Sequence, residues 1–383
     1  MVPPDRENPV SIPVVLGVVA LAIWLVLIFA RGLFWLPRLP PSAPEPQRWP
    51  AVVAVVPARD EAAVIERSIG SLLAQDYPGA FSIVLVDDHS GDGTAEIARR
   101  LAGPDRLKIV AAPPLPHGWT GKLSAMNRGV EEAGQAELIL FTDADIAHHT
   151  TNLRELAAHL DHEKRDLVSL MVRLNCDSAA ERLLIPAFVF FFAMLYPFAW
   201  VNDRHRRTAA AAGGCMLIRR SALGRIGGIA AIKGELIDDC ALARAVKAGG
   251  AIRLDLTHDT ASTRPYPRIA DIWNMIARSA YNQMRYSPAL LAGTIVGMTV
   301  TYIAPPLLLF VGGAAAWLGA ASWLLMSLAY MPMVRFYRQS PVWAAVLPLT
   351  ALIYLGATIA SAWRHFRGVG GSWKGRVEWR SAR

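Results

Sequence analysis

The stretch ELILFTDADI, residues 137–146, joins a run of apolar residues to two acids, Asp143 and Asp145. A continuous apolar run of this length is typical of a strand that is buried on both faces. Two carboxylates at alternate positions after a strand can both reach one hard cation, Mg²⁺ or Mn²⁺. The D-x-D pattern alone is weak, because a solvated loop or a helix N-cap explains it as well. Its meaning therefore depends on the rest of the chain.

Residues 51–286 alternate between candidate strands and candidate helices. The segments AVVAVVPARDE and FSIVLVDDHSGDGT also run from an apolar stretch into acids, Asp60 with Glu61 and Asp87 with Asp88. Apolar strands that alternate with helices predict a mostly parallel α/β sheet covered on both faces. Ligands of such sheets bind beyond the carboxyl ends of the strands. We therefore expect these acids and the D-x-D pair to converge on one site.

A later segment, ELIDDCALARAVKAGG, predicts an amphipathic helix with acids at its start: Glu235, Asp238 and Asp239. If the helix has begun at Glu235, that residue lies one turn from Asp239. The acids either complement the helix dipole or supply a general base at the mouth of the sheet. Lys122, in GWTGKLS, is either a solvated loop lysine or a residue of the same site.

The composition bounds the class of protein. The chain has 383 residues, a net charge of +8 and a mean hydropathy of +0.30, which together predict a membrane protein that binds acidic phosphates. Nucleic acid is the poorer partner, because the basic residues are dispersed among membrane-like segments. Three cysteines without metal-ligand spacing argue against a disulfide scaffold and suit a reducing cytosol.

Residues 1–31 predict an N-terminal transmembrane anchor, because their uncharged run is longer than the apolar core of a signal peptide. A proline-rich linker, residues 32–50, follows it. The positive-inside rule predicts that the downstream side is cytoplasmic. The charges that decide this are Arg31 and Arg38 after the span, and Asp5, Arg6 and Glu7 before it.

The region 287–363 is apolar again and precedes a basic tail, residues 364–383. Three crossings of this region would place the tail opposite a cytoplasmic block, against the positive-inside rule. Either one segment is re-entrant, such as the one broken by Pro305 and Pro306, or the rule fails. The candidate spans are 289–311, 313–331 and 342–363.

The order of six motifs resembles a family 2 glycosyltransferase with the GT-A fold, over residues 51–286. They are PARDE, VDDHSGDGT, GWTGKLSAMNRG, TDADI, GGCMLIRRSAL and IDDCALARAVKAGG. The last arginine motif departs from the family, because Q-x-x-R-W is replaced by residues around Asn282, Arg285 and Tyr286. That departure favours a single transfer over polymer synthesis. The anchor, the phenylalanine-rich insert, the C-terminal hairpins and SWKGRVEW are similar to the hopanoid-associated glycosyltransferases.

The resemblance implies a role for each matching residue and an inverting transfer from a nucleotide sugar, with a UDP-sugar favoured. Asp239 would be the catalytic base, and Asp143 and Asp145 would bind Mg²⁺ or Mn²⁺. The donor and its nucleotide would contact Asp60, Glu61, Asp88, Lys122, Asn127 and Arg285, with Asp87, Asp238 and Glu235 as secondary candidates.

The implied acceptor is a lipid hydroxyl, and the hydroxyl of a hopanoid is the candidate that the resemblance suggests. Alternative products are a polyprenyl-phosphate sugar, a glycosylceramide or a glycosylcarotenoid, and a non-enzymatic alternative is an inactive nucleotide-binding membrane protein. The apolar stretch 183–201 is predicted not to cross the bilayer, because Asp145 and Asp239 must share one side. It is then either a buried core helix or a membrane-interface helix that leads a lipid acceptor to the site.

Overall fold

The computed structural model describes residues 11–368, 372–373 and 376–377, which form two compact units. Unit 1 contains residues up to 37, 176–195 and 267–363, and unit 2 contains 38–175, 196–266 and the residues from 364 onward. The predicted glycosyltransferase block, 51–286, is thus divided, because residues 176–195 and 267–286 belong to unit 1. The charges predicted to flank the anchor at positions 5–7, and much of the basic tail, lie outside the described residues.

Unit 2 is built on an eight-stranded sheet in the order β3-β2-β1-β4-β7-β6-β8-β5. The first four of these strands in that order run parallel, β7 is antiparallel to both of its neighbours, and β5 is antiparallel to β8. The mostly parallel α/β fold predicted from the apolar strands is confirmed. In chain order the strands are β1 (Val52–Ala58), β2 (Phe81–Asp87), β3 (Leu107–Ala111), β4 (Leu138–Phe141), β5 (Ile146–Ala147), β6 (Leu167–Arg173), β7 (Met216–Arg219) and β8 (Ile252–Ser262).

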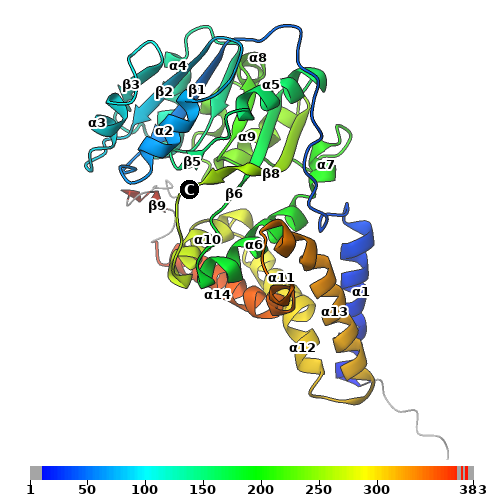
Figure 1. Cartoon of the computed structure of the whole chain (residues 1–383). Helices are drawn as coiled ribbons and strands as arrows, with labels where there is room; N and C mark the ends of the chain where they lie inside the picture. Colours follow the sequence, from blue (N-terminus) through cyan, green and yellow to red (C-terminus); the bar gives the residue numbers. More distant parts are fainter. Residues whose placement is uncertain (1–10, 369–371, 374–375, 378–383) are drawn as a thin grey trace, which may run out of the picture. The chain divides into compact units, whose positions relative to one another are not determined.

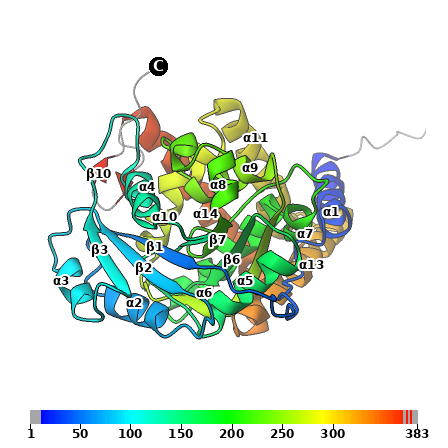
Figure 2. The same cartoon turned by 90° about the horizontal axis from the view of Figure 1, so that it is seen from above.

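Helices cover both faces of this sheet (Figure 2). On one face α2, α3 and α5 form an apolar core with the sheet, and α5 packs on β6 and β7. On the other face α4 packs on β1 and β2, and α9 packs on β8. The helices of this unit are α2 (Ile65–Leu73), α3 (Thr94–Arg99), α4 (Gly121–Glu132), α5 (Asn152–His162), α7 (Phe198–Asn202), α8 (Arg220–Arg225), the 3-10 helix η1 (Ile229–Ile232) and α9 (Asp238–Lys247). A short pair, β9 (Ser372–Trp373) and β10 (Arg376–Val377), follows near the C-terminus.

Gly129 allows α4 to approach β1 closely. A Cβ atom at this position would lie 2.2 Å from the Cγ1 atom of Val55. We expect Gly129→Ala to lower the free energy of unfolding by about 1–3 kcal/mol, because the strand or the helix must shift. Thermal unfolding in detergent measures the change. Gly70→Ala in α2 is the matched control, since a Cβ there meets nothing within 4 Å; equal unfolding temperatures for both variants would contradict the packing role.

Unit 1 consists of helices (Figure 1). They are α1 (Ile12–Ala30), α6 (Ala179–Leu195), α10 (Ile269–Gln283), α11 (Pro288–Met298), the π-helix η2 (Thr299–Ile303), α12 (Ala304–Leu308), α13 (Gly313–Phe336), the 3-10 helix η3 (Pro341–Val346) and α14 (Leu347–Phe366). Four helical segments are long and apolar enough to cross a bilayer: Ile12–Ala30, Pro288–Leu308, Gly313–Phe336 and Pro341–Phe366. They match the predicted anchor and the three predicted C-terminal candidates, and they indicate membrane association.

The helix break at the paired prolines is compensated by α1. Pro305 has no amide hydrogen, so the carbonyl of Thr301, four residues earlier, loses its helical donor. The indole Nε1 of Trp24 donates to that carbonyl at 3.0 Å. The Trp24 side chain is fully buried and its ring packs edge-on against Tyr302. The segment 288–308 therefore remains a continuous helical rod despite Pro305 and Pro306.

The apolar stretch 183–201 is not one helix. α6 ends at Leu195, and α7 begins after Pro197 and belongs to the other unit. Most of α6 is buried, including Leu184 and Phe190, and the stretch is not among the four long apolar segments. Its predicted place at the membrane interface stays a prediction.

Candidate active site

The acids predicted at the carboxyl ends of the strands lie at one edge of the sheet. β1 pairs in parallel with β2 on one side and with β4 on the other. The turns after these three strands therefore open on the same edge of the sheet. They carry Asp60 with Glu61, Asp87 with Asp88, and Asp143 with Asp145. This edge is where a parallel α/β sheet binds its ligands.

Lys122 is the cation at the centre of the first cluster. Its ammonium lies 2.8 Å from Asp143 Oδ1 and 3.1 Å from Asp238 Oδ2. α4 presents this lysine in its first turn, where Thr120 caps the helix by accepting from the amide of Leu123 at 3.3 Å. Burial by itself lowers the pKa of Lys122, but the charges of Asp143 and Asp238 outweigh it and raise that pKa. Lys122 is thus a charged, ion-paired residue of α4 and not a solvated loop lysine.

Asp239 lies beside this cluster at the start of α9. One of its carboxylate oxygens, Oδ2, accepts from the amide of Gly213 at 2.9 Å, and the other accepts from the amide of Cys240 at 2.7 Å. Burial, together with the neighbouring charge of Asp238, raises the pKa of Asp239 to about 6. A Cβ atom at Gly213 would lie 3.4 Å from Lys122 Nζ and 3.5 Å from Asp239 Oδ2. Gly213 therefore lies directly beside both groups.

Arg264, which was not predicted from the sequence, is the cation of a second cluster. Its Nε atom lies 2.7 Å from Asp145 Oδ2, and its Nη2 atom lies 2.5 Å from Glu61 Oε2. The residue follows the long strand β8, whose end is tied to the D-x-D turn by a hydrogen bond of 2.7 Å from the amide of Thr263 to the carbonyl of Asp145. The charges of Asp145 and Glu61 outweigh burial and raise the pKa of Arg264. Each acid of the D-x-D pair therefore has its own basic partner.

The buried side chain of His148 bonds to Thr142, the residue before the D-x-D pair. Its Nε2 atom lies 2.8 Å from Thr142 Oγ1, and that hydroxyl donates to the carbonyl of Gly214 at 2.8 Å. The Nδ1 atom of His148 lies 2.9 Å from Asn152 Nδ2. Burial lowers the pKa of His148 to about 3, so the ring is neutral. This chain of hydrogen bonds joins the residue before Asp143 to the glycine after Gly213.

The predicted nucleoside residues form a loop network beside these clusters. Asp60 has a positive φ of 52° and accepts from the amide of Gly91 at 2.9 Å. Asp88 is almost fully buried and lies 3.4 Å from Arg59 Nη1. Asp87 Oδ2 accepts from the amide of Ser90 at 3.3 Å, whereas its buried Oδ1 finds no donor among the described residues.

Among the described residues, no hydrogen bond or ion pair joins Asn127 or Glu235 to these clusters. Asn127 bonds along α4 to Glu131, with a nitrogen–oxygen distance of 2.9 Å. Glu235 is exposed and lies before α9, which begins only at Asp238, so the condition for a helical turn between Glu235 and Asp239 is not met. Arg285 has a positive φ of 52° and belongs to unit 1. The donor-site roles of Asn127 and Arg285 stay predictions.

Replacing Arg264 tests the second cluster. We expect Arg264→Met to lower the free energy of unfolding by about 2–3 kcal/mol, because it removes the guanidinium that the mostly buried carboxylates of Glu61 and Asp145 share. The figure is below that of a fully buried pair, since the Arg264 side chain is 29% exposed. Thermal unfolding measures the effect against Arg207→Met, an exposed arginine of the same unit. Equal unfolding temperatures for the two variants would mean that the Arg264 ion pairs contribute nothing.

Comparison with known proteins identifies the class. A mannosyltransferase from Pyrobaculum calidifontis, solved in complex with GDP-Man and Mn²⁺, has the same fold, with a TM-score of 0.55 and 20% identity over 92% of this chain and 99% of that chain. Glycosyltransferase AglE of Haloferax volcanii is 30% identical over 138 residues, which are 35% of this chain and 44% of that protein. A beta-monoglucosyldiacylglycerol synthase of Trichormus variabilis is 33% identical over 133 residues, 34% of this chain and 26% of that protein. The matched regions thus span less than half of these two relatives.

The likeness to the solved mannosyltransferase shows a GT-A-like fold, and the match to a glycosyltransferase family model gives the enzyme class. The model of glycosyl transferase family 21 matches residues 12–382, so the chain belongs to that family. The resemblance to family 2 was therefore correct for the fold and the enzyme class, and the family itself is family 21. The match does not distinguish a hopanoid-associated subfamily.

Proposed function

We propose that the protein transfers a single sugar from a nucleotide-sugar donor to a lipid hydroxyl, with inversion at the anomeric carbon. One observation carries the proposal. Five carboxylates and two basic side chains meet at the carboxyl edge of the sheet, and Lys122 and Asp239 both lie beside Gly213. Such a site can hold a charged diphosphate and deprotonate an acceptor at the same place.

The D-x-D pair fits a divalent cation. Mg²⁺ and Mn²⁺ prefer carboxylate oxygens, and Mg²⁺ is commonly held by one or two carboxylates that substrate phosphates complete. Asp143 and Asp145 supply such a pair, and no larger group of metal ligands occurs among the described residues. The two clusters contain three more acids than bases, namely Glu61, Asp143, Asp145, Asp238 and Asp239 against Lys122 and Arg264. This excess of negative charge favours a cation. When bound, the metal would neutralise the charge that develops on the leaving diphosphate.

The chain's own residues then divide the remaining work. Lys122 and Arg264 each lie beside one carboxylate of the D-x-D pair, so their charges would also face the oxygens of a diphosphate held there. Asp239 accepts the proton of the acceptor hydroxyl as the oxygen attacks the anomeric carbon. The amide of Gly213 holds one oxygen of that carboxylate and so fixes its orientation.

The rate should follow the ionisation of Asp239. Because its pKa is raised to about 6, the base form is lost as the pH falls through that value. We expect kcat/KM to rise with pH and to level off above about pH 6, where an unperturbed carboxylate would already level off near its ordinary value of about 3.9. Initial rates of nucleotide release between pH 4.5 and 8.5 test this. A flat profile down to pH 5 would remove Asp239 from the role of base.

A lipid acceptor is favoured by the four long apolar helices in the same chain. The beta-monoglucosyldiacylglycerol synthase of Trichormus variabilis, by its name, forms a glycolipid. A hopanoid hydroxyl is one candidate within this class. A glycosylceramide or a glycosylcarotenoid would be made by the same chemistry.

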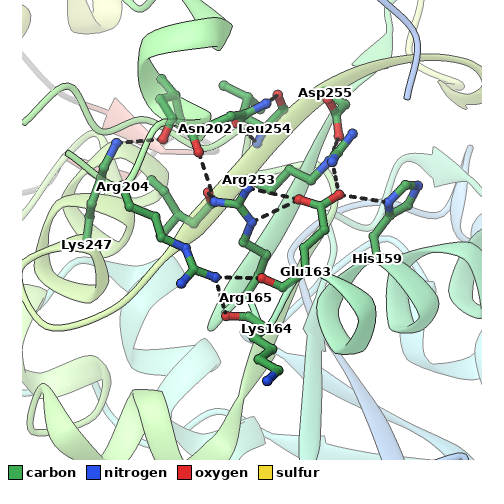
Figure 3. Close-up of polar contacts among 12 residues, drawn as sticks. His159, Glu163, Lys164, Arg165, Asn202, Arg204, Lys247, Arg253, Leu254 and Asp255 are labelled. Atoms are coloured by element: carbon green, nitrogen blue, oxygen red, sulfur yellow. Dashed lines mark hydrogen bonds and ion pairs between the residues drawn. The ribbon is translucent and has the colours of Figure 1, made fainter. Parts of the chain in front are cut away.

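Four basic-type residues follow Val201, and they would suit a polyprenyl phosphate as the acceptor: Arg204, His205, Arg206 and Arg207. The contacts of these residues give that alternative little support. Arg204 Nη2 donates to the carbonyls of Glu163 at 2.7 Å and of Lys164 at 3.4 Å (Figure 3). Arg206 lies over the ring of Trp200 at 5.1 Å and 3.8 Å from Asp203 Oδ2. Arg204 and Arg206 therefore already contact residues of their own unit.

A donor panel tests the proposed activity. Purified protein with Mn²⁺ or Mg²⁺ is incubated with UDP-, GDP- and TDP-sugars, and nucleotide release is measured with and without a bacterial lipid extract. We expect one donor to be consumed, UDP-sugar first, and consumption to depend on both the metal and the lipid. Absence of lipid-dependent release with every donor would contradict the proposal and favour a nucleotide-binding protein without transfer activity.

Unit 2 is placed in the cytoplasm in this proposal, where nucleotide sugars are made. Arg31 and Arg38 follow the first long helix, and the positive-inside rule places such residues on the cytoplasmic side.

A further inference from the structure

We infer that the last long apolar segment, Pro341–Phe366, does not cross the membrane and instead enters and leaves it on the same face. The chain would then cross three times, through α1, through α11 to α12, and through α13. The inference concerns unit 1 and does not depend on the proposed chemistry. It rests on the places where unit 1 is joined covalently to unit 2, which we call the crossover residues: Pro37, Cys176, Leu195, Pro267 and Trp363.

The three remaining spans share one end near crossover residues. At the end of α1, Arg31 Nε donates to the carbonyl of Met194 at 3.0 Å and Arg31 Nη2 donates to that of Leu195 at 3.2 Å. Just after α13, Gln339 Nε2 donates to the carbonyl of Cys176 at 3.4 Å. The C-terminal ends of α1 and α13 are therefore both on the face where the chain passes to unit 2, and the segment 341–366 starts there.

The opposite end of the group is also defined by contacts. A Cβ atom at Gly17 would lie 2.7 Å from Leu318 Cβ, and one at Gly319 would lie 2.6 Å from the carbonyl oxygen of Pro305. The start of α1, the end of α12 and the start of α13 thus lie together. The link between α12 and α13, residues 309–312, has no charged residue and exposes Phe310 and Val311.

The segment 341–366 first runs back along α13. The indole of Trp323 donates to the carbonyl of Ala345 in η3 at 2.9 Å. Trp323 lies thirteen positions before the end of α13, which corresponds to about 20 Å along that helix. η3 therefore descends beside α13 to roughly the middle of the bilayer, where α14 begins at the fully buried Leu347.

α14 then returns to the crossover face. Its first turns bond to α6, with Thr350 Oγ1 donating to the carbonyl of Leu183 at 3.1 Å and the hydroxyl of Tyr354 donating to that of Leu184 at 2.9 Å. Near its end, Ser361 Oγ accepts from the amide of Tyr281 in α10 at 3.0 Å. Tyr281 stands between Arg278 and Arg285, in a helix that begins two residues after Pro267, and charged residues hold such a helix at the membrane surface.

The side chains of α14 suit this course. Its buried face includes the polar side chains of Thr350, Thr358 and Ser361 among apolar ones, and Thr350 and Ser361 bond to α6 and α10. Backbone at membrane depth is tolerated where it is packed against protein in this way. The other face is exposed and apolar, and we assign it to the acyl chains of the leaflet on the crossover side. It consists of Leu349, Leu352, Ile359, Trp363 and Phe366.

The charges of the chain agree with three crossings. The described basic residues of unit 1 are Arg31, Arg182, Arg268, Arg278, Arg285, Arg335 and Arg338. Each lies in or beside a segment that begins or ends at the crossover face, and the link 309–312 has none. With two crossings between residue 267 and the tail, the tail returns to the side of unit 2. The positive-inside rule then holds for the spans and for the tail together, and the conflict met in the sequence disappears.

Thiol labelling of the full chain tests the topology. Val311→Cys and Ser381→Cys are placed singly in a Cys176→Ser background, since Cys215 and Cys240 are buried. A membrane-impermeant maleimide is applied to right-side-out and to inverted vesicles. We expect the two thiols to be labelled from opposite sides, with Ser381→Cys reached only in inverted vesicles. Labelling of both from the same side would overturn the three-crossing topology.

Spin labels on the two helices measure their depth independently. Labels at Leu349, Leu352, Ile359 and Phe366 should become steadily shallower along α14, as judged by accessibility to oxygen against a nickel chelate. Labels at Trp317, Leu324 and Leu328 of α13 are the control, and their depth should pass through a maximum within the bilayer. A maximum between Leu352 and Ile359 of α14, with Phe366 at the opposite surface, would show that α14 crosses.

Discussion

Asp239→Asn is expected to lower kcat by about 10²–10⁴-fold, the usual contribution of a general base. Asparagine keeps the size of the side chain and can still accept from the amide of Gly213, which bonds Asp239 Oδ2 at 2.9 Å. It cannot accept the proton of an attacking hydroxyl. The affinity for the donor should change little, because donor binding depends on the D-x-D side of the site. Rates of lipid-dependent nucleotide release and donor titrations by calorimetry measure the two quantities separately.

Two controls make this result specific. Asp105→Asn removes an exposed acid of the same unit and should leave both quantities unchanged. The acidic limb of the pH profile should also disappear from any residual activity of Asp239→Asn, since the group that titrates near pH 6 is gone. Turnover equal to that of the unaltered protein would assign the base to another residue, with Asp238 as the first alternative.

The double variant Asp143→Asn, Asp145→Asn is expected to abolish metal-dependent binding of the donor. A bound cation stabilises a diphosphate by several kcal/mol, so we expect the donor's Kd in Mn²⁺ to rise by about 10²-fold or more. The amides preserve the shape of the turn but lose both charges, which now face Lys122 at 2.8 Å and Arg264 at 2.7 Å. Calorimetric titration of a UDP-sugar with and without Mn²⁺ provides the measurement.

The single variants separate the two positions. Asp143→Asn leaves the pair of Asp145 with Arg264 in place, and Asp145→Asn leaves the pair of Asp143 with Lys122. Each should weaken the Mn²⁺ dependence, and Asp105→Asn should not. If the double variant binds the donor as tightly with Mn²⁺ as the unaltered protein does, the D-x-D pair does not hold the metal.

Much of the fold could be predicted because its signals are local. The apolar runs of β1, β2 and β4 and the helices between them are continuous in sequence, and a parallel sheet must bring their carboxyl ends to one edge. The acids at these ends were therefore found before any coordinates. By contrast, no local signal in the stretch 183–201 shows that α6 and α7 belong to different units.

The partners of the site acids could not be predicted in the same way. Glu61 and Arg264 are separated by 203 positions, and Asp145 and Arg264 by 119. Arg264 follows β8 in a segment with no motif, and only the placing of β8 at one side of the sheet brings it to the D-x-D turn. His148 likewise appeared as one of two adjacent histidines without ligand spacing. Its role in holding Thr142 depends on the return of β7 beside β4.

Two properties could be predicted from the amino-acid sequence: acids follow buried strands, and four segments are apolar enough to enter a bilayer. Both depend on patterns of neighbouring residues. Two other properties required the tertiary structure: which basic side chain pairs with which acid, and which helices the last apolar segment contacts. Ion pairs and helix contacts join residues that are distant in the chain, and their energies depend on distances of a few ångströms that no local pattern specifies.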